Sequence, residues 1–315
     1  MLPFSLKLPD SGTVEGRASI PKTESNKPRK FVPLIVCLHG GSYDAKYFDA
    51  NEEHSIATVA NFLNIPVISI NRPGYGGSTR PPKPSAALGQ AVPAGQSQGK
   101  YLNSVVLPAL WKKFGSEATG MVLLSHSIGS MVATVTAGSY QGTEGYPLVG
   151  LITSGIGVEA VEGPRQGMMD LMEIYPDSII LDCAMKDAVM LNFPAQRLVD
   201  PEMCLNTVQL NNPLPSDEVH DINVTWVTYM HEYMEQIKVP VMYGIGESDA
   251  LWKSRKDLVD RYRSCFTSSP RVDGCVVPMA PHCIEISHQS RSWLTRCCGF
   301  AIECTVRSGL LADAK

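Results

Sequence analysis

Apolar residues along the chain gather in short continuous runs that alternate with helix-length segments. Four such runs stand in the first half, in the stretches VPLIVCLHGG, IPVISINRPGYGGS, GMVLLS and PLVGLITSGIG. Unbroken apolar runs are typical of strands that are buried on both faces of a parallel sheet. The alternation therefore predicts an α/β fold, with a mostly parallel central sheet flanked by helices.

Further segments of the first 115 residues have their own patterns. Residues 3–9 and 13–21 alternate apolar and polar positions, which predicts exposed antiparallel strands at the start of the chain. Residues 95–115 predict a helix that Pro108 kinks or breaks. Residues 80–93 are rich in proline and predict a loop.

From about residue 158 to 236 the strand–helix alternation fails, and the sequence looks mostly helical and irregular. Eight of the thirteen methionines of the chain lie in this segment. The alternation then resumes with a strand, a helix, a last strand that ends near His282, and a closing helix over 284–304. We therefore expect a core made of residues 1–157 and 237–315, with residues 158–236 inserted between its two pieces.

Composition narrows the classes of function and partner. The net charge of −4 argues against a nucleic-acid partner, and we interpret the basic cluster at 27–30 as a solvated loop. No apolar run approaches the length of a membrane span, and no signal peptide is visible at the start. The nine cysteines include no CxxC pair, so we expect reduced thiols, a cytoplasmic protein, and neither a metal nor a cofactor. The oligomeric state stays open, with a homodimer among the alternatives.

The stretch SHSIGS follows the third apolar run and carries the first candidate for chemistry. A sharp turn from a strand into a helix exposes the residue at its tip, and it requires small residues two positions before and two after that tip. Ser125 and Gly129 satisfy this requirement around Ser127. The motif on its own leaves two alternatives open: a plain polar turn, or a turn that presents Ser127 as a nucleophile.

Four features together make the chain resemble the α/β-hydrolase family. They are LHGGS after the first buried strand, NRPGYGGS after the next, LLSHSIGS, and GIGESDALW followed by MAPHCIEIS. The resemblance covers nearly the whole chain except residues 158–236. It implies the α/β-hydrolase fold, with 158–236 as a mostly helical cap inserted after the sixth strand. It also implies a catalytic triad in the family's chain order, Ser127, Asp249 and His282.

The resemblance assigns a role to each of these residues. His282 would take the proton of the Ser127 hydroxyl and later return it to the leaving group, while Asp249 would orient the imidazole. The backbone N–H groups of Gly41 and Ile128 would form the oxyanion hole. We expect a small-molecule substrate in a pocket near the oxyanion hole and the cap, with Ser42, Met168, Met172 and Met190 as candidate pocket residues.

Several neighbouring residues are alternatives or supports. Glu247 and Glu159 are the alternatives to Asp249 as the orienting acid. We interpret His39 and His126 as structural supports of their turns. Arg72 is interpreted as a structural loop residue, with a contact to the oxyanion side or to the lid as the alternative.

These observations favour a serine hydrolase that cleaves an ester, thioester or lactone of a moderately hydrophobic small molecule through an acyl-enzyme. The same triad would also suit carbon–carbon bond hydrolysis, acyl transfer or cyclisation of a polyketide-like intermediate. A third hypothesis is a non-catalytic receptor for a small ligand on a hydrolase scaffold. The sequence also resembles tailoring hydrolases of secondary metabolism.

Overall fold

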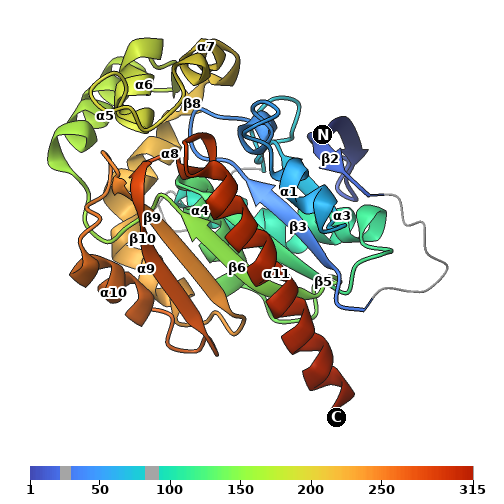
Figure 1. Ribbon diagram of the computed structural model, residues 1–315. Helices are drawn as coiled ribbons and strands as arrows, with labels where there is room; N and C mark the ends of the chain where they lie inside the picture. Colours follow the sequence, from blue (N-terminus) through green and yellow to red (C-terminus); the bar gives the residue numbers. More distant parts are fainter. Residues whose placement is uncertain (22–29, 82–91, 315) are drawn as a thin grey trace.

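The computed structural model describes residues 1–21, 30–81 and 92–314, and its centre is an eight-stranded sheet (Figure 1). The strand order is β1-β2-β4-β3-β5-β6-β9-β10. The pairs β1–β2 and β2–β4 are antiparallel, and all other neighbours are parallel. The strands are β1 (Leu2–Lys7), β2 (Thr13–Ser19), β3 (Pro33–Leu38), β4 (Val67–Ile70), β5 (Gly120–His126), β6 (Leu148–Ser154), β9 (Val241–Ser248) and β10 (Val272–Pro281).

The interior strands follow from the continuous apolar runs. Every residue of β3, β4, β5 and β6 is buried, because helices cover both faces of the sheet. On one face α11 crosses β3, β5 and β6 and packs on α1; on the other, α4 lies against β5 and β6 and contacts α2 (Figure 1). The core helices are η1 (Ala45–Phe48), α1 (Ile56–Phe62), α2 (Ala94–Tyr101), η2 (Leu102–Val106), α3 (Leu107–Phe114), α4 (Ile128–Gly138), α10 (Lys256–Ser264), η4 (Ile284–Ile286) and α11 (Ser290–Asp313).

Two of the expected helices differ in detail from the structure. The helix over 95–115 continues past Pro108, but a π-helical turn, η2, lies just before this proline, so the helix is distorted there and not ended. The closing helix begins later than residue 284 and continues to Asp313. Gly309 lies within this helix. A glycine is needed there because a Cβ would stand 2.4 Å from the Phe31 ring. Most of the loop at 80–93 and of the basic cluster at 27–30 lies outside the described residues.

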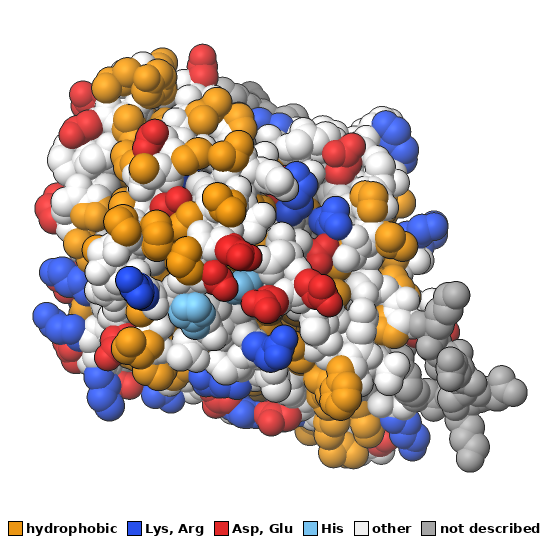
Figure 2. Space-filling view, turned by 45° about the horizontal axis from the view of Figure 1, so that its top comes forward, with side chains coloured by type: hydrophobic (Ala, Val, Ile, Leu, Met, Phe, Trp, Pro, Cys, Tyr) orange, Lys and Arg blue, Asp and Glu red, His pale blue; other side chains and the backbone are white. Residues whose placement is uncertain are grey.

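The segment between β6 and β9 lies mainly above the carboxyl ends of the parallel strands (Figure 1). Its last helix returns to the core and packs on α4. Apolar side chains gather on its outer surface (Figure 2), among them Ile174, Tyr175, Ile180, Leu205 and Val208. The elements are α5 (Glu162–Ile174), β7 (Ser178–Ile179), α6 (Cys183–Leu191), α7 (Pro201–Leu210), β8 (Leu214–Pro215), α8 (Ser216–His220), η3 (Asp221–Thr225) and α9 (Trp226–Met234).

None of the helices in residues 1–21, 30–81 and 92–314 is both long enough and apolar enough to cross a membrane.

Candidate active site

Ser127 occupies a strained turn between a strand and a helix. β5 ends at His126, α4 begins at Ile128, and Ser127 between them has φ 52° and ψ −123°. A residue other than glycine in this region of backbone space carries a cost of about 1–3 kcal/mol, and such outliers cluster at functional sites. The turn therefore holds the Ser127 side chain at the amino end of α4, above the end of the sheet.

The residues on either side of Ser127 explain how the turn closes. At Gly129 a Cβ would stand only 2.3 Å from the carbonyl oxygen of Leu38, so a larger residue would push α4 away from β3. Ser125 replaces the glycine often found two residues before the nucleophile. Its side chain is accommodated because the hydroxyl donates a hydrogen bond to the carbonyl of Ile152 on β6, at 2.8 Å.

The structure brings His282 and Asp249 to the same place from the ends of two neighbouring strands. β9 ends at Ser248 and β10 ends at Pro281, and these two residues are paired in the sheet. His282 Nδ1 lies 2.8 Å from Asp249 Oδ2, and His282 Nε2 lies 3.1 Å from Ser127 Oγ. The three residues predicted from the motifs therefore form one continuous hydrogen-bonded line.

The hydrogen bonds of Asp249 set the direction of this line. Its Oδ1 accepts the backbone N–H groups of Leu251 and Trp252, at 2.8 and 2.9 Å. A carboxylate can only accept hydrogen bonds. We therefore place the imidazole proton on His282 Nδ1, which donates to Oδ2. The lone pair of Nε2 is then directed at the Ser127 hydroxyl, as a general base requires.

Gly41 and Ile128 both line the pocket beside Ser127. Close packing holds them together, since a Cβ on Gly41 would stand 2.7 Å from Ile128 Cδ1. Within the described residues we find no hydrogen bond from the backbone N–H of either one. Two free donors beside a serine hydroxyl are the arrangement expected of an oxyanion hole.

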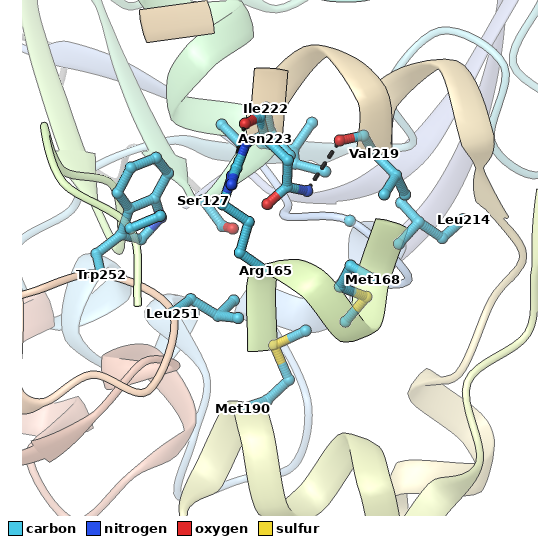
Figure 3. Close-up of a pocket in the computed structure, with 13 residues that line it drawn as sticks. Ser127, Arg165, Met168, Met190, Leu214, Val219, Ile222, Asn223, Leu251 and Trp252 are labelled. Carbon is cyan, nitrogen blue, oxygen red and sulfur yellow. Dashed lines mark hydrogen bonds between the residues drawn. The ribbon is translucent and has the colours of Figure 1, made fainter. Parts of the chain in front are cut away.

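The pocket itself has an empty volume of about 560 Å³, counted together with the part that is open to solvent (Figure 3). Of the four candidate pocket residues, Met168 and Met190 line it. Met172 packs against the core instead, and Ser42 is fully buried outside the lining. The sequence did not single out the remaining lining residues, which are Ala160, Arg165, Leu214, Val219, Ile222, Asn223, Leu251 and Trp252.

The two alternative acids lie away from His282. The exposed Glu247 accepts the backbone N–H of Met279, at 2.9 Å. Glu159 is half-buried and forms an ion pair with Lys253. Of the three acids considered, Asp249 is the one whose carboxyl group is hydrogen-bonded to the His282 ring.

His39 and Arg72 support the turn that carries Gly41. His39 Nδ1 donates to the carbonyl of Gly40, at 2.7 Å, and Nε2 accepts the backbone N–H of Arg72, at 3.1 Å. Burial, and then the charge of Arg72, lower the pKa of His39 well below its usual value. A neutral ring with one donor and one acceptor matches both contacts.

Arg72 also contacts the segment between β6 and β9. Its guanidinium makes two hydrogen bonds to Glu218 on α8, at 2.8 and 2.9 Å, and Nε donates to the carbonyl of His39, at 2.7 Å. Tyr75 and Gln98 complete the carboxylate's hydrogen bonds. Although burial alone would raise the pKa of Glu218, the charge of Arg72 lowers it. Both charges are fully buried and paired, so the loss of either partner would leave the other charge buried and uncompensated between α8 and the core.

A second cross-link was not visible in the sequence. The Lys186 ammonium on α6 is buried and donates to the carbonyls of Ser42 and Leu210, both at 2.8 Å. It also lies over the ring of Tyr43, 3.8 Å from the ring centre. Burial lowers the pKa of Lys186 to about 7.

Behind His282 lies a buried cluster that sequence reasoning also missed. Glu285 accepts hydrogen bonds from Tyr47, Ser154 and Trp293, at 2.7, 2.5 and 2.9 Å. His126 Nδ1 lies 3.4 Å from the same carboxyl group. Burial raises the pKa of Glu285 and lowers that of His126, so both groups are driven toward their neutral forms rather than toward an ion pair.

No group of three or more histidine, cysteine, aspartate or glutamate side chains in residues 1–21, 30–81 and 92–314 is placed to hold a metal ion.

Several known structures share this fold. An esterase from Thermogutta terrifontis aligns with a TM-score of 0.62 at 14% identity, covering 97% of this chain and 100% of that one. A monoglyceride lipase from Saccharomyces cerevisiae aligns with a TM-score of 0.64 at 12% identity, covering 96% and 95%. An N-acyl homoserine lactonase aligns with a TM-score of 0.60 at 14% identity, covering 96% and 97%.

At these identities the structures establish the shared fold. A search of curated proteins found no match to the chain. Residues 35–288, however, match the alpha/beta hydrolase family. The predicted family and the predicted fold are therefore confirmed, and the chain belongs to the alpha/beta hydrolase family.

Proposed function

We propose that this protein is a serine hydrolase that cleaves an ester, thioester or lactone of a moderately hydrophobic small molecule. The observation that carries the proposal is the line from Asp249 through His282 to the Ser127 hydroxyl. It lies beside two free backbone N–H groups and opens into a largely apolar pocket. The esterase, lipase and lactonase of similar fold support the same reaction class.

The reaction proceeds in two halves. His282 Nε2 takes the hydroxyl proton as Ser127 Oγ adds to the substrate carbonyl, and the N–H groups of Gly41 and Ile128 stabilise the oxyanion. The imidazolium then gives its proton to the departing alcohol or thiol, which leaves an acyl-serine. Water, deprotonated by the same nitrogen, adds to the acyl group and releases the carboxylic acid and Ser127.

We further propose that residues 158–236 act as a cap, with α5 to α8 over the site. Arg165, Met168, Met190, Val219 and Ile222 from this segment line the pocket that contains Ser127. The bonds from Glu218 to Arg72 and from Lys186 to Ser42 hold this cap to the core at two separated points. A largely apolar cap excludes water from the reacting carbonyl and selects hydrophobic substrates.

The nine cysteines support a proposed cytoplasmic location. None of them forms a disulfide in residues 1–21, 30–81 and 92–314, and Cys37, Cys283, Cys297, Cys298 and Cys304 are buried. Thiols persist in this state in a reducing compartment. A fluorescent fusion of the full chain tests the location directly.

Labelling by a fluorophosphonate probe tests the nucleophile. The Ser127→Ala variant is expected to lose labelling and hydrolysis of aryl esters completely, because the probe reacts with an activated serine hydroxyl. Ser125→Ala is the matched control, since the Ser125 hydroxyl is bonded to Ile152 and not to His282. It is expected to keep labelling, at a rate lowered by at most severalfold. Full labelling of Ser127→Ala would refute the assignment.

A further inference from the structure

The pocket beside Ser127 contains one charged side chain among thirteen lining residues, and that side chain is Arg165 of α5. Most of the others are apolar, such as Leu214, Ile222 and Leu251. A guanidinium at the edge of a largely apolar cavity is screened less than one on an open surface. The pocket therefore combines an apolar interior with one positive charge.

The guanidinium of Arg165 is held in place on one side and free on the other. Its Nε donates to the backbone carbonyl of Asn223, at 3.0 Å, and Nη1 lies 3.2 and 3.4 Å from the two carboxylate oxygens of Glu162. In the described part of the chain we find no partner for Nη2. Figure 3 shows the side chain reaching from α5 toward Asn223, across the pocket that also holds Ser127.

Two neighbours of Arg165 could change its part in the pocket. Glu162 could neutralise its charge, and Asn223 could replace it as a hydrogen-bond donor, but neither does so. The Glu162 side chain is 75% exposed, against 33% for Arg165, and an ion pair with so exposed a carboxylate is weak. The side-chain amide of Asn223 donates to the carbonyl of Val219, at 2.8 Å. That leaves Arg165 as the strong donor facing the pocket.

From this geometry we infer that the pocket takes substrates that carry a carboxylate, and that the guanidinium of Arg165 binds this group while Ser127 attacks the ester or thioester carbonyl. Arginine presents paired N–H donors in a fixed plane that matches a carboxylate, and such charge-assisted bonds are stronger than neutral ones. The inference rests on the proposed hydrolase function and names its substrate class.

Paired esters test the inference in the full-length protein, with 4-nitrophenolate followed by absorbance in the first pair and the released phenols followed by chromatography in the second. The 4-nitrophenyl monoester of glutaric acid carries a carboxylate on the acyl side, and 4-nitrophenyl valerate is its neutral counterpart of similar length. A second pair, 3-butyryloxybenzoate against phenyl butyrate, places the carboxylate on the leaving group. The ratio of kcat/KM within each pair measures charge recognition separately from hydrolysis.

In the wild type we expect the carboxylate-bearing ester of at least one pair to be preferred. In Arg165→Gln that ratio should fall by about 10- to 100-fold, because the larger part of the loss in kcat/KM falls on the carboxylate-bearing ester. Arg165→Lys should restore part of the ratio, because it keeps the charge but not the planar donor pair. Lys256→Gln, at an exposed position of α10, is the control for the loss of one positive charge and should leave the ratio unchanged.

The outcomes separate this inference from the proposed function. Hydrolysis of the neutral esters with no preference for a carboxylate in either pair would overturn the inference and leave the hydrolase proposal standing. An equal loss on both members of a pair in Arg165→Gln would also overturn it, because a structural role alone explains that result. If no ester is turned over and the fluorophosphonate does not label Ser127, both proposals fail.

Discussion

Two histidine–carboxyl groups lie side by side beneath the pocket, and they are built in opposite ways. His282 and His126 are both fully buried, and their ring centres are 4.7 Å apart. His282 is bonded to Asp249 and directs its second nitrogen at the Ser127 hydroxyl. His126 lies near Glu285, stacks on Tyr47, and directs its second nitrogen at Cys283 Sγ, 3.5 Å away.

The carboxyl groups account for the difference. Asp249 accepts two backbone N–H groups at Oδ1, and these hold its carboxyl group in place with Oδ2 facing the His282 ring. Glu285 is buried, and its pKa is raised. Burial of a histidine beside an acid therefore does not by itself create a base. The hydrogen bonds of the acid and the target of the second ring nitrogen decide the role.

Replacing Asp249 by a neutral residue should have the largest effect on kcat. In Asp249→Asn the side-chain amide would face His282 Nδ1, so the ring proton would move to Nε2, which could no longer accept the Ser127 proton. Such a change of tautomer lowers kcat by about 10³–10⁴ in serine hydrolase triads. We expect this loss with little change in KM, measured on an aryl ester.

The matched control for Asp249→Asn is Glu247→Gln, which removes an exposed acid two residues earlier. It should keep kcat within about twofold, because an exposed substitution away from the reacting groups has a small effect. If Glu247→Gln proved as damaging as Asp249→Asn, the role given to Asp249 would be wrong.

Changing the second histidine should act on stability more than on turnover. His126→Asn removes a buried ring that stacks on Tyr47 and leaves a cavity, so we expect a loss of about 2–4 kcal/mol in the free energy of unfolding. Because His126 is not bonded to Ser127, kcat should fall less than about tenfold. Urea unfolding and steady-state kinetics measure the two effects. A fall in kcat as large as that of Asp249→Asn, in a folded variant, would erase the distinction between the two rings.

Replacing Glu285 should have the smallest effect, and it should change how the free energy of unfolding depends on pH. Because the folded pKa of Glu285 is raised, this carboxyl group keeps its proton in the folded protein at pH values where it has lost it in the unfolded chain. Its contribution to the free energy of unfolding therefore falls as pH rises from about 4.5 through the folded pKa. Glu285→Gln lacks this group, so its stability should depend less on pH, while its altered hydrogen bonds cost about 1–3 kcal/mol.

Urea unfolding of the wild type and of Glu285→Gln across this pH range tests the expectation. Glu159→Gln provides a comparison at a half-buried carboxyl group, which is paired with Lys253. An unchanged pH dependence in Glu285→Gln would show that the buried carboxyl group does not take up a proton on folding.

The sequence predicted the parts of the molecule that depend on neighbours in the chain or on burial on both faces. The apolar runs gave β3, β4, β5 and β6, because strands covered on both sides need no polar positions. Ser127, Asp249 and His282 were predicted as a triad because each lies on a turn at the end of a strand, and each turn has its own local motif. The structure brings these three residues together as expected.

The parts that were missed depend on partners distant in the sequence. Arg72 and Glu218 are 146 positions apart, and Lys186 and Ser42 are 144 apart. A buried lysine and a buried glutamate look the same in a sequence as exposed ones, because the residue type does not reveal what covers it. Arg165 was overlooked for the same reason: only the fold of α5 against η3 brings it into the pocket.

The place of β10 at the edge of the sheet has a consequence for synthesis on the ribosome. Ser127 is made 155 residues before His282, and β10 is the last strand to join. Since chains begin to fold from their amino end, β5 and its turn are complete before the proposed base exists. In a nascent chain, and in a chain truncated before His282, Ser127 would thus be unreactive. A serine-reactive probe would then label only full-length molecules in which β10 has joined the sheet.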